Sequence, residues 1–195
     1  MADSPLLSSF FAEHMENAAQ VAGELPEQMS TAADGIVETL LNDGKVMMCA
    51  NGNANTLAQY FSTNLLNRFD QDRPALPAMN LGADGTTYSA ICRDNRFNET
   101  FSRQVRALGK EGDLLVVIVD DGHKANLIQA IQAAHDRDMR VLILSAQQKT
   151  DAHSLLQQED HALALPDVTP VQASTLFLLI VNALSALVDD KLFGG

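Results

Sequence analysis

The segment from 113 to 119 (DLLVVIV) constrains the fold of this 195-residue chain more than any other. It is almost entirely apolar and rich in β-branched residues, and glycine-containing turns flank it on both sides. Such a run predicts a strand that is covered by apolar side chains on both faces. Strands of this kind occur in parallel sheets whose crossover helices pack on either side. The segment therefore predicts the centre of a parallel α/β sheet.

Strand and helix patterns alternate through most of the chain. Further strands are predicted at 45–49, 78–81, 140–145 and 161–165, and helices at 55–69, 85–92, 98–108, 124–137 and 170–192. This alternation predicts an α/β fold, a doubly wound parallel sheet in three layers of the flavodoxin-like kind, with right-handed crossovers. Because no linker, repeat or low-complexity segment interrupts the pattern, we expect residues 1–195 to form a single domain.

Two helices with apolar faces are predicted ahead of the first strand. Apolar residues recur at helical spacing from Leu6 to Met15, and a second helix begins at Pro26 and ends before Gly44. An apolar stripe of this length has little of its own domain to cover. We therefore expect residues 1–43 to be a helical oligomerisation segment, giving a dimer or tetramer, and residues 44–195 to be the α/β core.

Composition narrows the classes of partner. The chain carries 13 basic and 25 acidic side chains, a net charge of −12, which disfavours direct nucleic-acid binding and favours a basic protein partner. The N-terminus lacks the basic region of a signal peptide, and no apolar run approaches the ~18 residues of a membrane span, so a cytoplasmic protein without membrane contact is expected. Cys49 and Cys92 form no CxxC pair and are expected to be free thiols.

Two loops are placed to bind a ligand, because ligands of open parallel sheets lie beyond the carboxyl ends of the strands. They follow the strands at 45–49 and 113–119. The candidate ligand-binding residues are Asn51, Gly52 and Asn53 in the first loop, Asn64 on the next helix, and Asp120, Asp121 and His123 in the second loop.

The chemistry of the two loops differs. Gly52 and Thr56 would let the first loop bind a polar ligand, but the same loop would also serve as a tight turn whose asparagines cap the next helix. In the second loop Asp120 and Asp121 argue against a sugar phosphate, since a like-charge contact at ~4 Å costs roughly 4 kcal/mol at an effective dielectric near 20. These carboxylates suit a hydroxylated or cationic ligand better.

Several stretches of the chain resemble a known family, the SIS (sugar isomerase) proteins of the phosphoheptose isomerase group. The similar segments are 49–54 (CANGNA), 58–61 (AQYF), 67–69 (NRF), 73–77 (RPALP), 101–109 (FSRQVRALG) and 137–139 (RDM). The resemblance extends over nearly the whole chain. The segments NRF and QVRALG, with the C-terminal Leu192-Phe193, are most similar to the DiaA branch of this group, the DnaA initiator-associating proteins.

The resemblance also implies what is missing. Isomerases of this group use a His and a Glu on the helix after the first loop, and a Gln and a His on the last helix, as acid/base groups and in some members as zinc ligands. The matching positions here are Tyr60, Asn64, Ser174 and Asn182. Amides and a serine do not titrate near neutral pH, and they cannot replace a zinc shell of imidazole and carboxylate. The resemblance therefore implies no catalytic residues, no metal ligands and no cofactor.

Three hypotheses about function follow. The first is a non-catalytic, oligomeric adaptor that binds an initiator of the DnaA type, with Leu192 and Phe193 as an exposed anchor beside acidic residues. In the structural alternative, this pair packs the last helix against a neighbour. The second hypothesis is a sedoheptulose-7-phosphate (phosphoheptose) isomerase. The third is a module that binds another small, sugar-like ligand.

Overall fold

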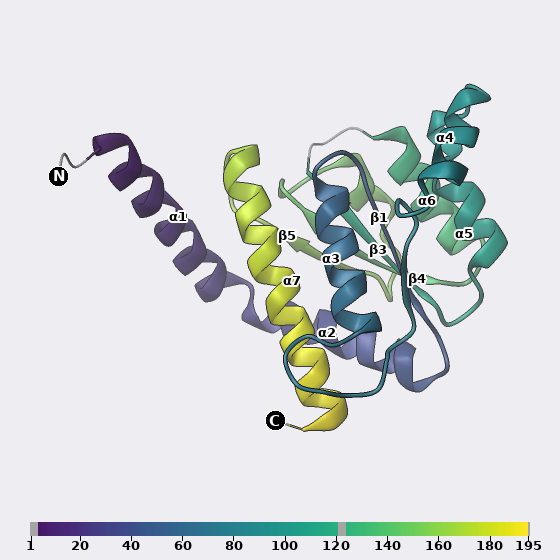
Figure 1. Ribbon diagram of the computed structural model, residues 1–195, viewed down its shortest axis with the longest axis horizontal. Helices are drawn as coiled ribbons and strands as arrows, with labels where there is room; N and C mark the ends of the chain where they lie inside the picture. Colours follow the sequence, from purple (N-terminus) through teal and green to yellow (C-terminus); the bar gives the residue numbers. More distant parts are fainter. Residues whose placement is uncertain (1–3, 121–123, 195) are drawn as a thin grey trace.

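The structure is a computed structural model, and it describes residues 4–120 and 124–194. Five strands form one parallel sheet in the order β2-β1-β3-β4-β5. They are β1 (Val46–Ala50), β2 (Ala78–Asn80), β3 (Leu114–Val119), β4 (Arg140–Ser145) and β5 (His161–Ala164). This order is that of the flavodoxin-like doubly wound fold. The predicted fold class is confirmed (Figure 1).

Helices connect the strands. Within the described residues they are α1 (Pro5–Glu24), α2 (Pro26–Leu41), α3 (Ala54–Leu66), α4 (Gly85–Arg93), α5 (Ser102–Leu108), α6 (Ala125–His135) and α7 (Pro170–Phe193), with short 3-10 helices η1 (Phe97–Glu99) and η2 (Asp151–Leu155). The helix predicted at 98–108 is divided into η1 and α5. The Thr100 hydroxyl donates to the Phe97 carbonyl at 2.8 Å, which closes η1 before α5 begins.

The sheet separates two apolar cores because successive strand residues point to opposite faces. Leu114, Val116 and Ile118 of β3 belong to the core that α2, α3 and α7 cover. The residues between them belong to the core that α5 and α6 cover. Every residue of β1 and β3 is buried, as the apolar run at 113–119 predicts for a central strand.

Helix α7 is the longest helix of the described residues, and it is long and apolar enough to cross a membrane by length and composition alone. The expectation that no segment reaches this length is therefore wrong. The buried side of α7 includes Leu176, Phe177, Ile180 and Val181, which pack in the core with α2 and α3. We assign α7 as a core helix of the α/β domain.

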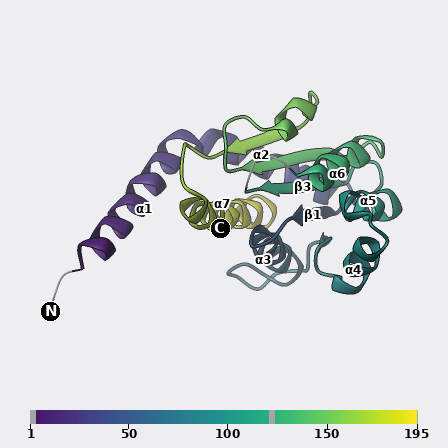
Figure 2. The same ribbon diagram turned by 90° about the horizontal axis from the view of Figure 1, so that it is seen from above.

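Helix α1 leaves the body of the molecule and projects beside the first half of α7 (Figures 1 and 2). Its contact with α7 includes a hydrogen bond from Gln172 Nε2 to Glu13 Oε2 at 3.1 Å, and its buried residue is Val21. The apolar side chains near its N-terminus are exposed: Leu6, Leu7, Phe10, Phe11 and Met15. The predicted apolar stripe thus has no cover within one copy of the described chain.

Candidate functional site

The loops after β1 and β3 lie side by side because these two strands are neighbours in the sheet. The chain moves outward from β1 to β2 and then returns to β3, so this is the point at which the strand order reverses. Ligands of doubly wound proteins bind at such a switch point. The candidate residues Asn51 and Asp120 both lie here, each directly after its strand.

The first loop is a tight turn joined to the second by a pair of amides. Asn51 Nδ2 donates to Asn126 Oδ1 at 2.9 Å, and Asn126 Nδ2 donates to Asn51 Oδ1 at 2.8 Å. Asn126 is fully buried and also contacts the Thr100 hydroxyl at 3.3 Å. Asn51 therefore holds the start of α6 against the end of β1. Asn126 and Thr100 were missed as site residues, and the signal for Asn126 was its place in the first turn of the helix after β3.

Gly52 and Asn53 form the turn itself. Gly52 has a φ of 52°, a left-handed conformation that favours glycine. Both residues are exposed, and the Asn53 side chain makes no capping hydrogen bond to α3. The expectation that asparagines of this loop cap the next helix does not hold for Asn53. Its amide points to no partner in the described chain and is available to a polar ligand.

Asn64 lies apart from these loops. It is buried near the end of α3, and its Nδ2 donates to Ser185 Oγ on α7 at 3.1 Å. Ser185 in turn donates to the Val181 carbonyl at 2.8 Å. The side chain of Asn64 thus joins α3 to α7, and the structure does not bring it together with Asn51 or Asp120.

Asp120 directly follows β3, at the carboxyl ends of the strands, and is half-buried. Asp121 and His123 were predicted to complete this loop, and they lie outside the described residues. Lys124 precedes α6 and is its N-cap residue. The acidic character of the second loop is therefore seen here through Asp120 alone.

The positions that match the isomerase acid/base groups are spread along α3 and α7. Tyr60 is exposed on α3, and Ser174 is exposed on α7, where its hydroxyl donates to the Pro170 carbonyl at 3.1 Å. Asn182 is half-buried, and its Oδ1 is a buried atom with no hydrogen-bond donor within the described chain. Together with Asn64, these side chains supply amides, a hydroxyl and a phenol.

Three other titratable groups of the described chain are held in local structure or in the core. Burial lowers the pKa of His153, whose Nδ1 accepts from the Thr150 amide at 3.1 Å within η2. His135 is paired with the buried Asp160 at 2.8 Å, at the amino-terminal side of β4. Burial raises the pKa of the Cys49 thiol, so this thiol stays protonated. In the part of the chain that the structure describes, no three His, Cys, Asp or Glu side chains gather to hold a metal.

The C-terminal pair Leu192-Phe193 lies at the opposite end of α7 from Ser174. Leu192 is half-buried and packs against the core, whereas the Phe193 ring is 46% exposed. The Arg73 guanidinium lies 5.9 Å from the centre of the Phe193 ring. The two residues predicted to form one exposed anchor therefore differ in exposure. Phe193 is exposed, and Leu192 packs inward.

These features define a doubly wound α/β domain with its candidate ligand loops at the switch point and a projecting helix at its N-terminus. The chain belongs to the SIS domain family, whose pattern matches residues 9–146.

Similar proteins carry two kinds of name. A phosphoheptose isomerase of Chromohalobacter salexigens is 42% identical over 170 residues, which cover 87% of this chain and 86% of that protein. The DnaA initiator-associating protein DiaA of Yersinia enterocolitica is 36% identical over 183 residues, which cover 94% and 93%. Among solved structures, a phosphoheptose isomerase from Francisella tularensis has a TM-score of 0.92 at 33% identity, covering 98% of this chain and 100% of that one.

The amide pair of the site is open to a direct test. Replacing Asn51 or Asn126 by Ala removes both hydrogen bonds of the amide pair, and we expect each change to lower the free energy of unfolding by about 1–3 kcal/mol. The double variant should cost about 1 kcal/mol less than the sum of the two single changes. Denaturant unfolding measures all three, with Asn53→Ala as the matched control. Additive effects of the two changes would contradict the reciprocal pairing.

Proposed function

We propose that this chain is a non-catalytic SIS-domain adaptor of the DiaA kind, which assembles into an oligomer and binds a replication initiator of the DnaA type. One observation carries the proposal: the positions that resemble the isomerase acid/base groups hold Tyr60, Asn64, Ser174 and Asn182. Two of these side chains are already engaged in local structure, Asn64 with Ser185 and Ser174 with a main-chain carbonyl.

Isomerisation between an aldose and a ketose needs a base that removes a proton next to a carbonyl and an acid that returns it. Amides and serine do neither near neutral pH, and tyrosine ionises only near pH 10. Zinc is implied by some members of the family, but the four residues do not fit it, because zinc sites are built from imidazole, thiolate and carboxylate. In the second loop, Asp120 directly follows β3, and its carboxylate would oppose the phosphate of a substrate bound there.

The names of the similar proteins also support a second candidate function. Proteins named phosphoheptose isomerase are 42% and 36% identical to this chain, against 36% for the DiaA of Yersinia enterocolitica, so sedoheptulose-7-phosphate isomerisation is the alternative function. A third function, binding another small sugar-like ligand, rests on Asn51, Gly52 and Asn53 beside Asp120. It is compatible with the adaptor, because a ligand at the switch point and a partner at the end of α7 would occupy different surfaces.

We further propose that residues 1–43 are the oligomerisation segment of one SIS domain that spans 1–195, and that the protein acts in the cytoplasm. The exposed apolar face of α1 supports the assembly. An apolar face on a projecting helix is stabilised when a second copy covers it. Several copies in one assembly present several initiator-binding surfaces, and such multivalency raises the local concentration of the initiator without any chemistry.

The first test is enzymatic. With sedoheptulose 7-phosphate as substrate, we expect no turnover with or without added zinc, because the acid and base are missing. A coupled assay run beside a known phosphoheptose isomerase measures this. Turnover at ordinary enzyme rates, ~1–10³ s⁻¹, would establish the alternative instead.

The second test concerns assembly. Replacing Leu7 and Phe11 by Glu places charges on the apolar face of α1, and we expect the oligomer to dissociate into smaller species that remain folded. Ser9→Glu is the matched control, because helical spacing puts Ser9 on the other side of α1. Size-exclusion chromatography with light scattering measures the mass of each variant. A wild-type chain that is monomeric at micromolar concentration would refute the assembly.

The third test concerns the partner. We expect Phe193→Ala to keep its fold and mass but to lose at least about tenfold in affinity for a DnaA-type initiator, as truncating an exposed aromatic anchor typically does. Leu192→Ala should chiefly lower the melting temperature, because Leu192 packs inward. Pull-downs and melting curves on the same preparations measure both. Unchanged capture by a folded Phe193→Ala oligomer would remove Phe193 as the anchor.

A further inference from the structure

A cavity of about 190 Å³ opens at the C-terminal end of α7, on a surface that neither the loop site nor the assembly face includes. Its walls come from the loop after α3 and from the last turns of α7. The two aromatic rings in its lining are Phe69 and Phe193, and the carboxylates at its mouth include Asp70, Asp72 and Asp190. The cavity is smaller than the roughly 300–1,000 Å³ of pockets that enclose whole small-molecule ligands. It has room for one large side chain.

The wall that comes from the α3 loop is held in place by Arg73, whose side chain is only 4% exposed. Its Nε donates to Asp189 Oδ1 at 2.8 Å, and its Nη atoms donate to the carbonyls of Leu65 at 2.8 Å and Asn64 at 2.6 Å. One guanidinium thus ties the loop both to the end of α3 and to α7. The cavity is part of the packed structure and needs no ligand to form.

The charge of this cavity is unbalanced. Arg73 is neutralised by Asp189, and Lys191 turns away to Asp34, with Nζ 2.7 Å from its Oδ1. Arg68 at the edge donates to the main-chain carbonyl of Asp70 at 3.4 Å. The carboxylates of Asp70, Asp72 and Asp190 have no ion pair within the described residues, and all three residues are exposed. The mouth of an aromatic cavity is therefore anionic.

Inside the cavity, one cation already lies beside an aromatic ring. Arg73 already places its guanidinium 5.9 Å from the centre of the Phe193 ring, within the range of a cation–π contact. The carboxylates at the mouth would pair with the edge of a second guanidinium approaching from solvent, while its planar face stacks on an aromatic ring. An ammonium group lacks both the planar face and the bidentate edge.

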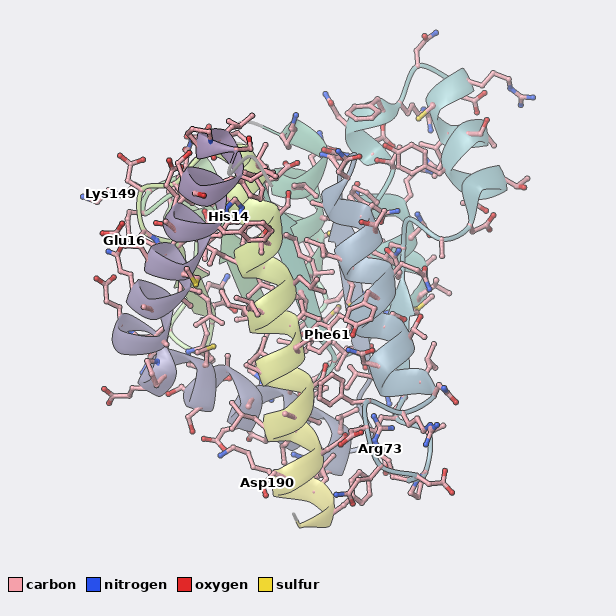
Figure 3. The ribbon with its side chains drawn as sticks, turned by 60° about the vertical axis from the view of Figure 1, so that its left-hand side comes forward. His14, Glu16, Phe61, Arg73, Lys149 and Asp190 are labelled. Carbon is pink, nitrogen blue, oxygen red and sulfur yellow. The ribbon has the colours of Figure 1, made fainter. Side chains whose placement is uncertain are left out.

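The cavity also stays open in the proposed assembly. Figure 3 places Arg73 and Asp190 at one end of α7 and His14 of α1 at the other. The exposed apolar residues of α1 lie in the same half of that helix as His14. A second copy that covers the apolar face of α1 would therefore leave the far end of α7 exposed to a partner.

We infer that this cavity binds an arginine side chain from a basic segment of the partner protein, between Phe69 and Phe193 and against the carboxylates of Asp72 and Asp190. The inference rests on the proposed adaptor function for the identity of the partner but not for the chemistry of the site. It adds to that function the side chain that the partner must offer.

The test uses a fluorescently labelled peptide, acetyl-Gly-Arg-Leu-Arg-Gly-amide, and the same peptide with citrulline in place of both arginines. Citrulline keeps the shape of arginine and removes its charge. We expect the full-length protein to bind the arginine peptide at least about tenfold more tightly, with binding that weakens as salt is raised. Equal binding of the two peptides, or no binding of either, would overturn the inference.

Protein variants locate the binding. Asp72→Asn and Asp190→Asn should each weaken the arginine peptide severalfold and leave the citrulline peptide unchanged, and Phe193→Ala should weaken it by about tenfold. Asp167→Asn and Phe97→Ala are the matched controls, since both residues are exposed and lie outside the cavity. Equal loss in the control variants would overturn the assignment. Circular dichroism melting establishes that each variant is folded.

The experiments distinguish a failure of the adaptor proposal from a failure of the arginine-site proposal. If the arginine peptide binds with this pattern of variants but a DnaA-type initiator is not captured, the adaptor function is wrong and the arginine site stands. If the initiator is captured equally by wild type, Asp190→Asn and Phe193→Ala, the adaptor stands and its partner does not use this cavity, which overturns the inference.

Discussion

The side chain of Asp113 is fully buried and joins the segments that enter the two central strands. Its Oδ1 accepts from the Lys45 amide and its Oδ2 from the Lys110 amide, each at 2.9 Å, and the Lys45 ammonium forms an ion pair with it. A buried carboxylate without such partners costs several kcal/mol, so β1 and β3 are held in the register that pairs Val46 with Leu114. At their other ends the same two strands deliver the candidate loops. The position of the candidate ligand loops therefore depends on a contact at the opposite ends of these two strands.

Helix α7 organises the remaining surfaces. It covers one face of the sheet together with α2 and α3, it contacts α1 near its start, and it supplies Phe193 at its end. The proposed assembly surface and the proposed partner surface thus lie at two ends of one rigid element. A buried hydrogen bond from Asn64 on α3 to Ser185 fixes the helix between these ends. The resemblance matches Asn64 to a glutamate of the isomerases, and in this structure the Asn64 side chain packs α3 against α7.

Patterns that depend on local sequence predicted the fold well. The apolar run at 113–119 becomes the central strand, the strand predicted at 140–145 has those bounds, and the last helix extends one residue beyond its prediction. The division of the helix at 98–108 was missed, because it depends on a hydroxyl bond of Thr100. Periodicity carries no information about such a bond.

Contacts between residues that are distant in the chain could not be predicted from the sequence. Asn51 and Asn126 are 75 positions apart, and only the pairing of β1 with β3 brings their amides together. Leu192 and Phe193 are adjacent in the chain but differ in exposure, because the core lies on one side of α7 and solvent on the other. The cavity of the proposed arginine site was likewise not predictable, since half of its lining follows α3 and half ends α7.

The bonds of Arg73 have a consequence for how such a surface changes over evolution. Arg73 holds its loop through the main-chain carbonyls of Asn64, Leu65 and Pro74, and through one carboxylate on α7. None of these four acceptors belongs to the side chains at 69–72 that face the cavity. The identity of those side chains is therefore uncoupled from the path of the loop. As long as Arg73 and Asp189 are kept, we expect substitutions at 69–72 to change the chemistry of the proposed arginine site while the loop keeps its path and the domain stays folded.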